Sequence, residues 1–182
     1  MTGPSGPGAT LWLTGLPSSG KTTLAGALGD RLRAEGRAVE LLDGDELRTW
    51  LSSELGFARA DRDTHVRRVG WVAQRLAAHG VLALVPVIAP YAQARAQVRA
   101  HHQASGTRYL EVHVATPLAE CARRDVKGLY ARARAGQVRG LTGVDDPYEP
   151  PDAPDLRLDT SRTSLAQAVS VLHALLVPQE SR

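Results

Sequence analysis

The chain of 182 residues is poor in several features that would place it in a special class of protein. It has one cysteine, Cys121, so no internal disulfide can form. It has no apolar run of about 18 residues, the length a membrane-spanning helix needs. Its first ten residues are rich in Gly, Pro and Ser and lack the basic start and apolar stretch of a secretory signal. We therefore expect a cytoplasmic protein with a disordered tail at residues 1–10.

The chain also lacks a strong excess of charge of one sign. It has 22 Lys and Arg against 19 Asp and Glu, a net charge of +3, and the two signs are interspersed. A nucleic-acid-binding protein usually concentrates its cations in a stripe, so a small anionic ligand is favoured over a polymer. No internal repeat is present, and no Asn-Lys-x-Asp segment is found that would recognise guanine. The latter absence argues against a GTP-specific switch.

Short apolar runs alternate with segments of helical periodicity along the chain. Strands are predicted at 11–14, 39–42, 81–88, 109–114 and 156–158, and helices at 22–34, 46–55, 61–79, 91–102, 117–124 and 165–176. This alternation predicts a parallel α/β sheet that binds ligands at the carboxyl ends of its strands. Residues 11–178 are expected to form one domain, followed by a tail at 179–182. The Gly- and Pro-rich segment 125–154 is predicted to be a mobile lid.

A glycine-rich motif follows the first predicted strand. Residues 15–22 fit G-x-x-x-x-G-K-[ST] at every fixed position and lead into a predicted helix. In such a loop backbone N–H groups surround phosphate oxygens, Lys21 reaches the β- and γ-phosphates, and Thr22 ligates Mg²⁺. The predicted ATP-binding residues are Gly15, Leu16, Pro17, Ser18, Ser19, Gly20, Lys21, Thr22 and Thr23. The fold expected is a three-layer P-loop NTPase fold of the nucleotide-kinase type.

An acidic turn, Asp43-Gly44-Asp45, follows the second predicted strand. At the carboxyl end of that strand its carboxylates would lie beside the phosphate loop. There a carboxylate can hold the metal or accept the proton of an attacking hydroxyl group. The alternative is that the aspartates merely cap the next helix. The position after the second strand favours the first interpretation.

Further short motifs follow in a fixed order. They are Leu55-Gly56-Phe57, Asp61-Arg62, Arg67-Arg68-Val69-Gly70, Pro90-Tyr91, Cys121-Ala122-Arg123-Arg124-Asp125, Lys127-Gly128-Leu129-Tyr130, Ala133-Arg134-Ala135-Gly136, Thr142-Gly143 and Asp146-Pro147-Tyr148-Glu149-Pro150-Pro151. With the phosphate loop and the acidic turn, the chain from Leu11 to about Thr160 resembles adenylylsulfate kinase. This ordered set is far more specific than a phosphate loop alone.

The resemblance implies an ATP-dependent kinase whose acceptor is the 3′-hydroxyl of adenosine 5′-phosphosulfate, and it suggests a homodimer. It places Asp45 near the acceptor ribose and the Mg²⁺ ion, with Asp43 supporting it, so that Lys21, Asp45 and Asp43 would be the catalytic residues. Arg124 would lie by the base of ATP. A lid over residues 127–144, including Lys127, would close over both nucleotides and exclude water.

The implied reaction is the transfer of a phosphoryl group from ATP to the 3′-hydroxyl of adenosine 5′-phosphosulfate. For that acceptor the resemblance implies that Arg48 and Arg62 grip the phosphosulfate and that Phe57 stacks on the adenine. These roles suit the residue types, because guanidinium groups pair with phosphate and sulfate oxygens and an aromatic ring stacks on a base.

Four positions depart from the family pattern, and they lie on the acceptor side. His65 stands where Asn is usual, which puts a titratable ring beside the substrate. Ala89 replaces the serine of a Ser-Pro pair, so a route through phosphoserine is closed and direct transfer remains. Leu141 replaces a phenylalanine that would stack on the adenine, and Gln137 replaces a lysine of the lid. The kinase could therefore keep its acceptor with altered affinity, or be retuned to another 5′-substituted nucleotide or small molecule.

Other interpretations stay open at this point. A non-enzymatic ATP-binding switch is the main alternative outside the enzymes. Several side chains also have plain structural interpretations: Arg62, Arg67 and Arg68 as the solvated face of a helix, Phe57 as core, Cys121 as a small buried side chain, His101 and His102 as helix surface, and Trp50 and Trp71 as packing.

Overall fold

The computed structural model describes residues 6–177 and contains one five-stranded parallel sheet. The strands are β1 (Ala9–Thr14), β2 (Val39–Leu41), β3 (Leu82–Pro86), β4 (Arg108–Val114) and β5 (Leu156–Leu158). Their order in the sheet is β2-β3-β1-β4-β5, so β1 is central and passes directly into the phosphate loop. The predicted parallel α/β fold is confirmed.

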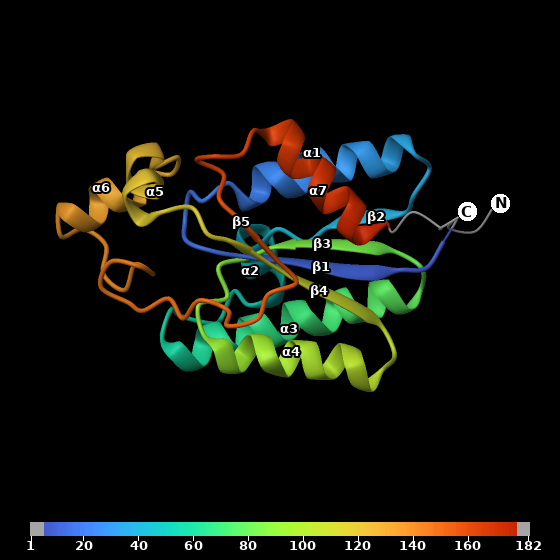
Figure 1. The fold of residues 1–182 in the computed structure, drawn as a ribbon. Coiled ribbons are helices and arrows are strands. Elements are labelled where there is room, and N and C mark those ends of the chain that lie inside the picture. The colour runs from blue at the N-terminus through green and yellow to red at the C-terminus, as the bar shows by residue number, and fades with distance from the viewer. Residues whose placement is uncertain (1–5, 178–182) are drawn as a thin grey trace.

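Helices cover both faces of the sheet, which makes three layers (Figure 1). They are α1 (Lys21–Ala34), α2 (Gly44–Leu51), α3 (Arg59–Ala78), α4 (Ala92–Ala104), α5 (Leu118–Arg124), α6 (Leu129–Arg134) and α7 (Leu165–Leu176). Helices α1 and α7 lie on one face, and α3 and α4 lie on the other. Helices α5 and α6 extend beyond the end of the sheet where β1 leads into α1.

Two apolar layers hold the sheet between its helices. Leu11 and Leu13 of β1 pack toward α1 and α7, whereas Trp12 of the same strand packs toward α3 and α4. This alternation buries both faces of β1, as expected for the central strand of a covered parallel sheet. Strand β3 begins at Leu82 and ends at Pro86, so it is three residues shorter than the predicted 81–88.

Several sequence predictions are wrong at the level of individual elements. Strand β1 begins at Ala9, so Ala9 and Thr10, assigned to the tail, are buried in the sheet. Helix α2 ends at Leu51 instead of residue 55. The short helix α6 lies inside the segment predicted to be a mobile lid. The rest of the predicted N-terminal tail up to residue 5, and the predicted tail at 179–182, lie outside the described residues.

Three aromatic side chains and one thiol test the packing interpretations. Trp50 and Trp71 were predicted to pack, but they are 79% and 57% exposed. His102 was predicted to lie on the helix surface, but it is fully buried. Cys121 is buried, as predicted. Among the helices of residues 6–177, none has the length and apolar character needed to cross a membrane.

Candidate functional site

The phosphate loop connects β1 to α1, and its backbone conformation depends on small residues. A Cβ atom at Gly15 would lie 2.5 Å from the carbonyl oxygen of Val114, so only glycine fits between the two strands' ends. Ser18 and Gly20 have φ angles of 60° and 98°, in the left-handed region. These angles turn the chain sharply before α1, so that the first N–H groups of the helix face the loop, an arrangement that favours bound anions.

Lys21 is the first residue of α1 and its ammonium group lies inside the loop. It donates hydrogen bonds to the carbonyl oxygens of Gly15 at 2.9 Å and Leu16 at 2.7 Å, and to the Ser19 hydroxyl at 3.3 Å. Burial lowers the pKa of Lys21 to about 8. The charge is therefore held in a desolvated place where an anion would be attracted strongly.

The acidic turn lies beside the loop, and Asp43 both caps the next helix and contacts the loop. The Asp43 carboxylate caps α2 by accepting from the Asp45 N–H at 3.0 Å, and it also accepts from the Thr22 hydroxyl at 3.1 Å. The Asp45 carboxylate is exposed and pairs with Lys127 of the lid. The turn thus joins the phosphate loop to the lid.

The predicted acceptor residues Arg48 and Phe57 lie together. Phe57 is 67% exposed, so the interpretation of this ring as core is wrong. The guanidinium of Arg48 lies 4.6 Å from the centre of the Phe57 ring and donates to the Gly56 carbonyl at 2.9 Å. An exposed ring held by a cation in this way offers a flat apolar face next to positive charge.

Arg62 is buried, so the solvated-face interpretation is wrong for this residue. Its guanidinium donates to the Phe57 carbonyl at 2.7 Å, the Thr142 hydroxyl at 2.7 Å and the Gly140 carbonyl at 2.6 Å. It also lies 3.4 Å from the Asp146 carboxylate. Arg62 therefore connects α3 to the lid, in addition to lying near Phe57.

The positions that depart from the family pattern have distinct environments. His65 is buried, and Ser52 lies 2.9 Å from its Nδ1 atom. Burial and then the charge of Arg48 lower the pKa of His65 to about 4, so the ring is neutral at pH 7. Ala89 is buried with a φ of 44°. Leu141 is buried in a small lid core with Cys121 and Tyr130, where it presents no open face.

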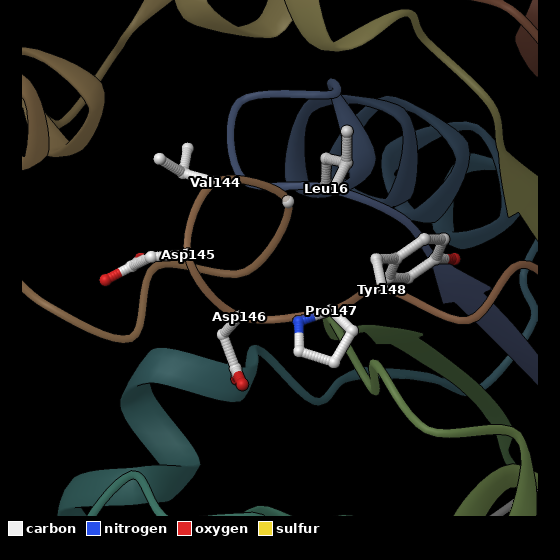
Figure 2. A pocket seen from close by; sticks show the side chains of 7 residues that line it. Leu16, Val144, Asp145, Asp146, Pro147 and Tyr148 are labelled. Carbon is white, nitrogen blue, oxygen red and sulfur yellow. The ribbon is translucent and has the colours of Figure 1, made fainter.

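A pocket of about 490 Å³ separates the phosphate loop from the last part of the lid. It is lined by Leu16 and by residues 143–148 (Figure 2). Tyr148 closes one end, and its hydroxyl lies 3.0 Å from that of Thr14 at the end of β1. The volume suits part of a nucleotide, and Leu16 of the phosphate loop lines the pocket.

Two threonines that the sequence analysis missed support the loop from the ends of β4 and β5. The hydroxyls of Thr116 and Thr160 both donate to the Ser19 carbonyl, at 3.0 and 2.9 Å. Arg124 donates to the Thr160 hydroxyl at 2.7 Å, so the residue predicted near the ATP base is tied to the loop through Thr160. Thr116 and Thr160 lie just after predicted strands. Because ligands bind at the carboxyl ends of strands, this position was the signal that could have identified both threonines.

Comparisons with known proteins agree on one family. The family model for adenylylsulphate kinase matches residues 7–159. An adenylyl-sulfate kinase of Synechococcus sp. (strain JA-3-3Ab) is 50% identical over 165 residues, which is 91% of this chain and 92% of the relative. A probable adenylyl-sulfate kinase of Aeropyrum pernix is 46% identical over 169 residues, 93% of this chain and 92% of the relative.

Solved structures of high similarity belong to the same family. The Mycobacterium tuberculosis APS kinase CysC in complex with AMPPNP and APS superposes with a TM-score of 0.89 at 46% identity, over 93% of this chain and 98% of that one. A hexameric APS kinase from Thiobacillus denitrificans has a TM-score of 0.70 at 40% identity, over 93% of this chain and 29% of that one.

Proposed function

The chain belongs to the adenylylsulfate kinase family, and from that premise we infer how its residues carry out the reaction. It is an ATP-dependent kinase that phosphorylates the 3′-hydroxyl of adenosine 5′-phosphosulfate, giving 3′-phosphoadenosine 5′-phosphosulfate and ADP. The observation that carries this function is the meeting of the phosphate loop with the acidic turn, where Thr22 contacts Asp43. The degree of identity supports this acceptor over a retuned one or a non-enzymatic switch.

On the ATP side, the loop from Gly15 to Thr23 would bind the phosphates. The Lys21 ammonium, which has three N–H donors and bonds the Gly15 and Leu16 carbonyl oxygens here, would turn donors toward oxygens of the β- and γ-phosphates. Thr116 and Thr160 hold the Ser19 carbonyl, which fixes the N–H groups of the loop. Arg124 would border the base of ATP.

We propose that Mg²⁺ binds with ATP at the Thr22 hydroxyl and the acidic turn. Residues 6–177 contain no group of three or more His, Cys, Asp or Glu that could hold a metal ion alone. Mg²⁺ fits such a place, because it is commonly held by one or two carboxylates together with substrate phosphates and water. Asp45 is the ligand predicted from the sequence, and the contact with Thr22 adds Asp43. When bound, the ion neutralises charge on the phosphates.

On the acceptor side, Asp45 would accept the proton of the attacking 3′-hydroxyl group. Its exposed carboxylate pairs with Lys127, so the lid contacts the proposed base in this structure. Phe57 would stack on the adenine, and Arg48 and Arg62 would bind the phosphosulfate. Arg62 would also keep the lid segment around Thr142 in place, which excludes water from the γ-phosphoryl group.

We further propose that the protein is cytoplasmic and forms a homodimer. The exposed ring of Trp71, beside a groove of about 330 Å³ with Leu51 and Val72, supports an association surface on α3. Sedimentation velocity of the wild type and of Trp71→Ala tests this. A dimer in the wild type that dissociates in the variant is expected, and a monomeric wild type would reject the homodimer.

The activity is tested by a coupled assay of ADP release with and without adenosine 5′-phosphosulfate. Release that depends on this nucleotide and on Mg²⁺ is expected. ADP release that the nucleotide does not stimulate, alongside normal ATP binding, would reject the assigned acceptor and favour a retuned kinase. Absence of ADP release with any acceptor would favour a switch.

A further inference from the structure

Arg95, in the first turn of α4, joins two loops on the acceptor side of the site. Its side chain is 3% exposed. One terminal nitrogen donates to the Ala89 carbonyl at 2.7 Å, and the other donates to the Glu149 carbonyl at 2.6 Å. Ala89 belongs to the loop after β3, and Glu149 belongs to the segment that leads back from the lid. A single guanidinium therefore links the loop after β3 to Glu149, which lies 54 residues after Arg95 in the sequence.

The charge of Arg95 is balanced beneath the site by Glu111 of β4. The Arg95 Nε atom lies 3.1 Å from one carboxylate oxygen of Glu111, and Arg99 lies 3.5 Å from the other. Buried ion pairs contribute little net stability, because desolvation offsets their attraction. The pair is better explained by the hydrogen bonds that the two terminal nitrogens of Arg95 make to the Ala89 and Glu149 carbonyl oxygens.

The backbone of Ala89 has a conformation that its neighbours must maintain. Its φ of 44° lies in the left-handed region, which is sterically unfavourable for a residue with a Cβ atom. Such conformations persist where surrounding contacts fix them. The hydrogen bond from Arg95 to the Ala89 carbonyl and that from the Thr14 hydroxyl to the Ile88 carbonyl, at 2.6 Å, are such contacts.

The returning lid segment is fixed at the same place. The Glu149 carboxylate accepts from the Ala92 N–H at 2.7 Å, and the Glu149 N–H donates to the Pro90 carbonyl at 2.8 Å. The next residue back, Tyr148, lines the pocket beside the phosphate loop (Figure 2). A shift of Glu149 relative to Ala89 would therefore change the shape of that pocket.

We propose that Arg95 is a positioning residue for the acceptor nucleotide, because it sets the spacing between the Ala89 loop and the returning lid segment. This inference rests on the proposed function and on the family resemblance, which puts Ala89 on the acceptor side. ATP is held by the phosphate loop, which Arg95 does not contact among the interactions described here. Loss of Arg95 should therefore act on the acceptor and leave ATP binding nearly unchanged.

The test variant is Arg95→Lys. Lysine keeps the positive charge opposite Glu111, but one ammonium group cannot reproduce the planar fork that reaches both carbonyl oxygens. The expected result is a rise of about tenfold in KM for adenosine 5′-phosphosulfate, the size of effect of one lost charged hydrogen bond. KM for ATP should stay close to that of the wild type.

Arg99→Lys is the matched control, since Arg99 lies one turn along α4 and pairs with the same Glu111. It contacts neither Ala89 nor Glu149 in the interactions that the structure records, so its KM values should not change. A second test places Ala89→Gly in the Arg95→Lys background. Glycine adopts a positive φ without strain, so the effect of Arg95→Lys on KM should be smaller there than with alanine.

Two outcomes would overturn the inference, and they differ from failure of the function. If the wild type turns over the acceptor but Arg95→Lys behaves like Arg99→Lys, Arg95 has no positioning role. The same follows if Arg95→Lys raises both KM values equally, because that result indicates general loss of structure. If the wild type shows no acceptor-dependent turnover, the proposed function fails and this inference fails with it.

Discussion

The hydroxyl of Thr22 donates a hydrogen bond to the carboxylate of Asp43, with 3.1 Å between the two oxygens. Thr22 lies in the first turn of α1 and Asp43 caps α2, so this contact joins the phosphate loop to the acidic turn. The sequence pattern favours Asp45 as the main carboxylate, with Asp43 in support. The geometry places Asp43 closer to the loop and leaves Asp45 facing the lid.

Asp43→Asn should therefore lower kcat strongly without loss of the fold. Asparagine caps a helix about as well as aspartate, so α2 should remain stable. The lost negative charge beside Thr22 should reduce kcat by about 100-fold or more and raise the Mg²⁺ concentration needed for half-maximal rate. Initial rates measured across a Mg²⁺ titration check this, with Asp30→Asn, an exposed site on α1, as the control. Wild-type rates with an unchanged Mg²⁺ dependence would contradict it.

Lys21→Ala should abolish phosphoryl transfer while the fold is kept. The Lys21 ammonium is the buried cation of the phosphate loop, and no other side chain donates to the Gly15 or Leu16 carbonyl among the recorded contacts of residues 6–177. We expect kcat to fall by at least about 100-fold, as for loss of a donor to a developing negative charge. Single-turnover measurements and thermal melting check both parts. Full turnover in the variant would exclude the assigned role.

The fold and the ATP side could be predicted from local patterns. Buried strands of a covered parallel sheet are continuously apolar, and the phosphate loop has a fixed spacing of Gly, Lys and Thr. The residues of β1 and α1 carry both signals within a short stretch of chain. This is why the sheet and the loop were identified without any knowledge of distant contacts.

The acceptor side could not be predicted as fully, because it depends on contacts between distant segments. Arg62 meets Thr142 from 80 residues away, so helical periodicity alone made it resemble a solvated residue. The buried ring of His102 lies 2.9 Å from the Thr10 hydroxyl, a contact across 92 residues that helical periodicity does not reveal. The exposed positions of Trp50 and Trp71 also depend on which face of each helix meets the sheet.

Phe57→Ala should weaken binding of the acceptor without destabilising the protein. The ring is 67% exposed, so its removal leaves no cavity, and exposed substitutions usually change stability by less than about 0.5 kcal/mol. Loss of stacking on a base is worth about 1 to 3 kcal/mol, so KM for adenosine 5′-phosphosulfate should rise about tenfold. Steady-state kinetics with each substrate varied check this. Trp50→Ala, an exposed aromatic on α2, is the control, and an equal rise in both variants would argue against stacking.

Acid should destabilise the protein through its buried histidines. Burial is the main cause that lowers the pKa of His65 and of His113 to about 4, and burial also lowers the pKa of His102. Between pH 6.5 and about 4 the unfolded chain therefore binds more protons than the folded one. Stability rises with pH in this window, so it must fall as the pH is lowered from 6.5 toward 4.

For His65 alone the loss between pH 7 and 5 is of the order of 2 kcal/mol, or about 5 °C in melting temperature. His65→Asn should remove this part of the loss, since a neutral amide can still bond Ser52 and does not titrate. His101→Asn, at an exposed position of α4, should retain the full loss. Melting temperatures of the wild type, His65→Asn and His101→Asn at pH 7 and pH 5 test this prediction. If the fall in melting temperature is the same in all three, His65 is not neutralised by burial as described.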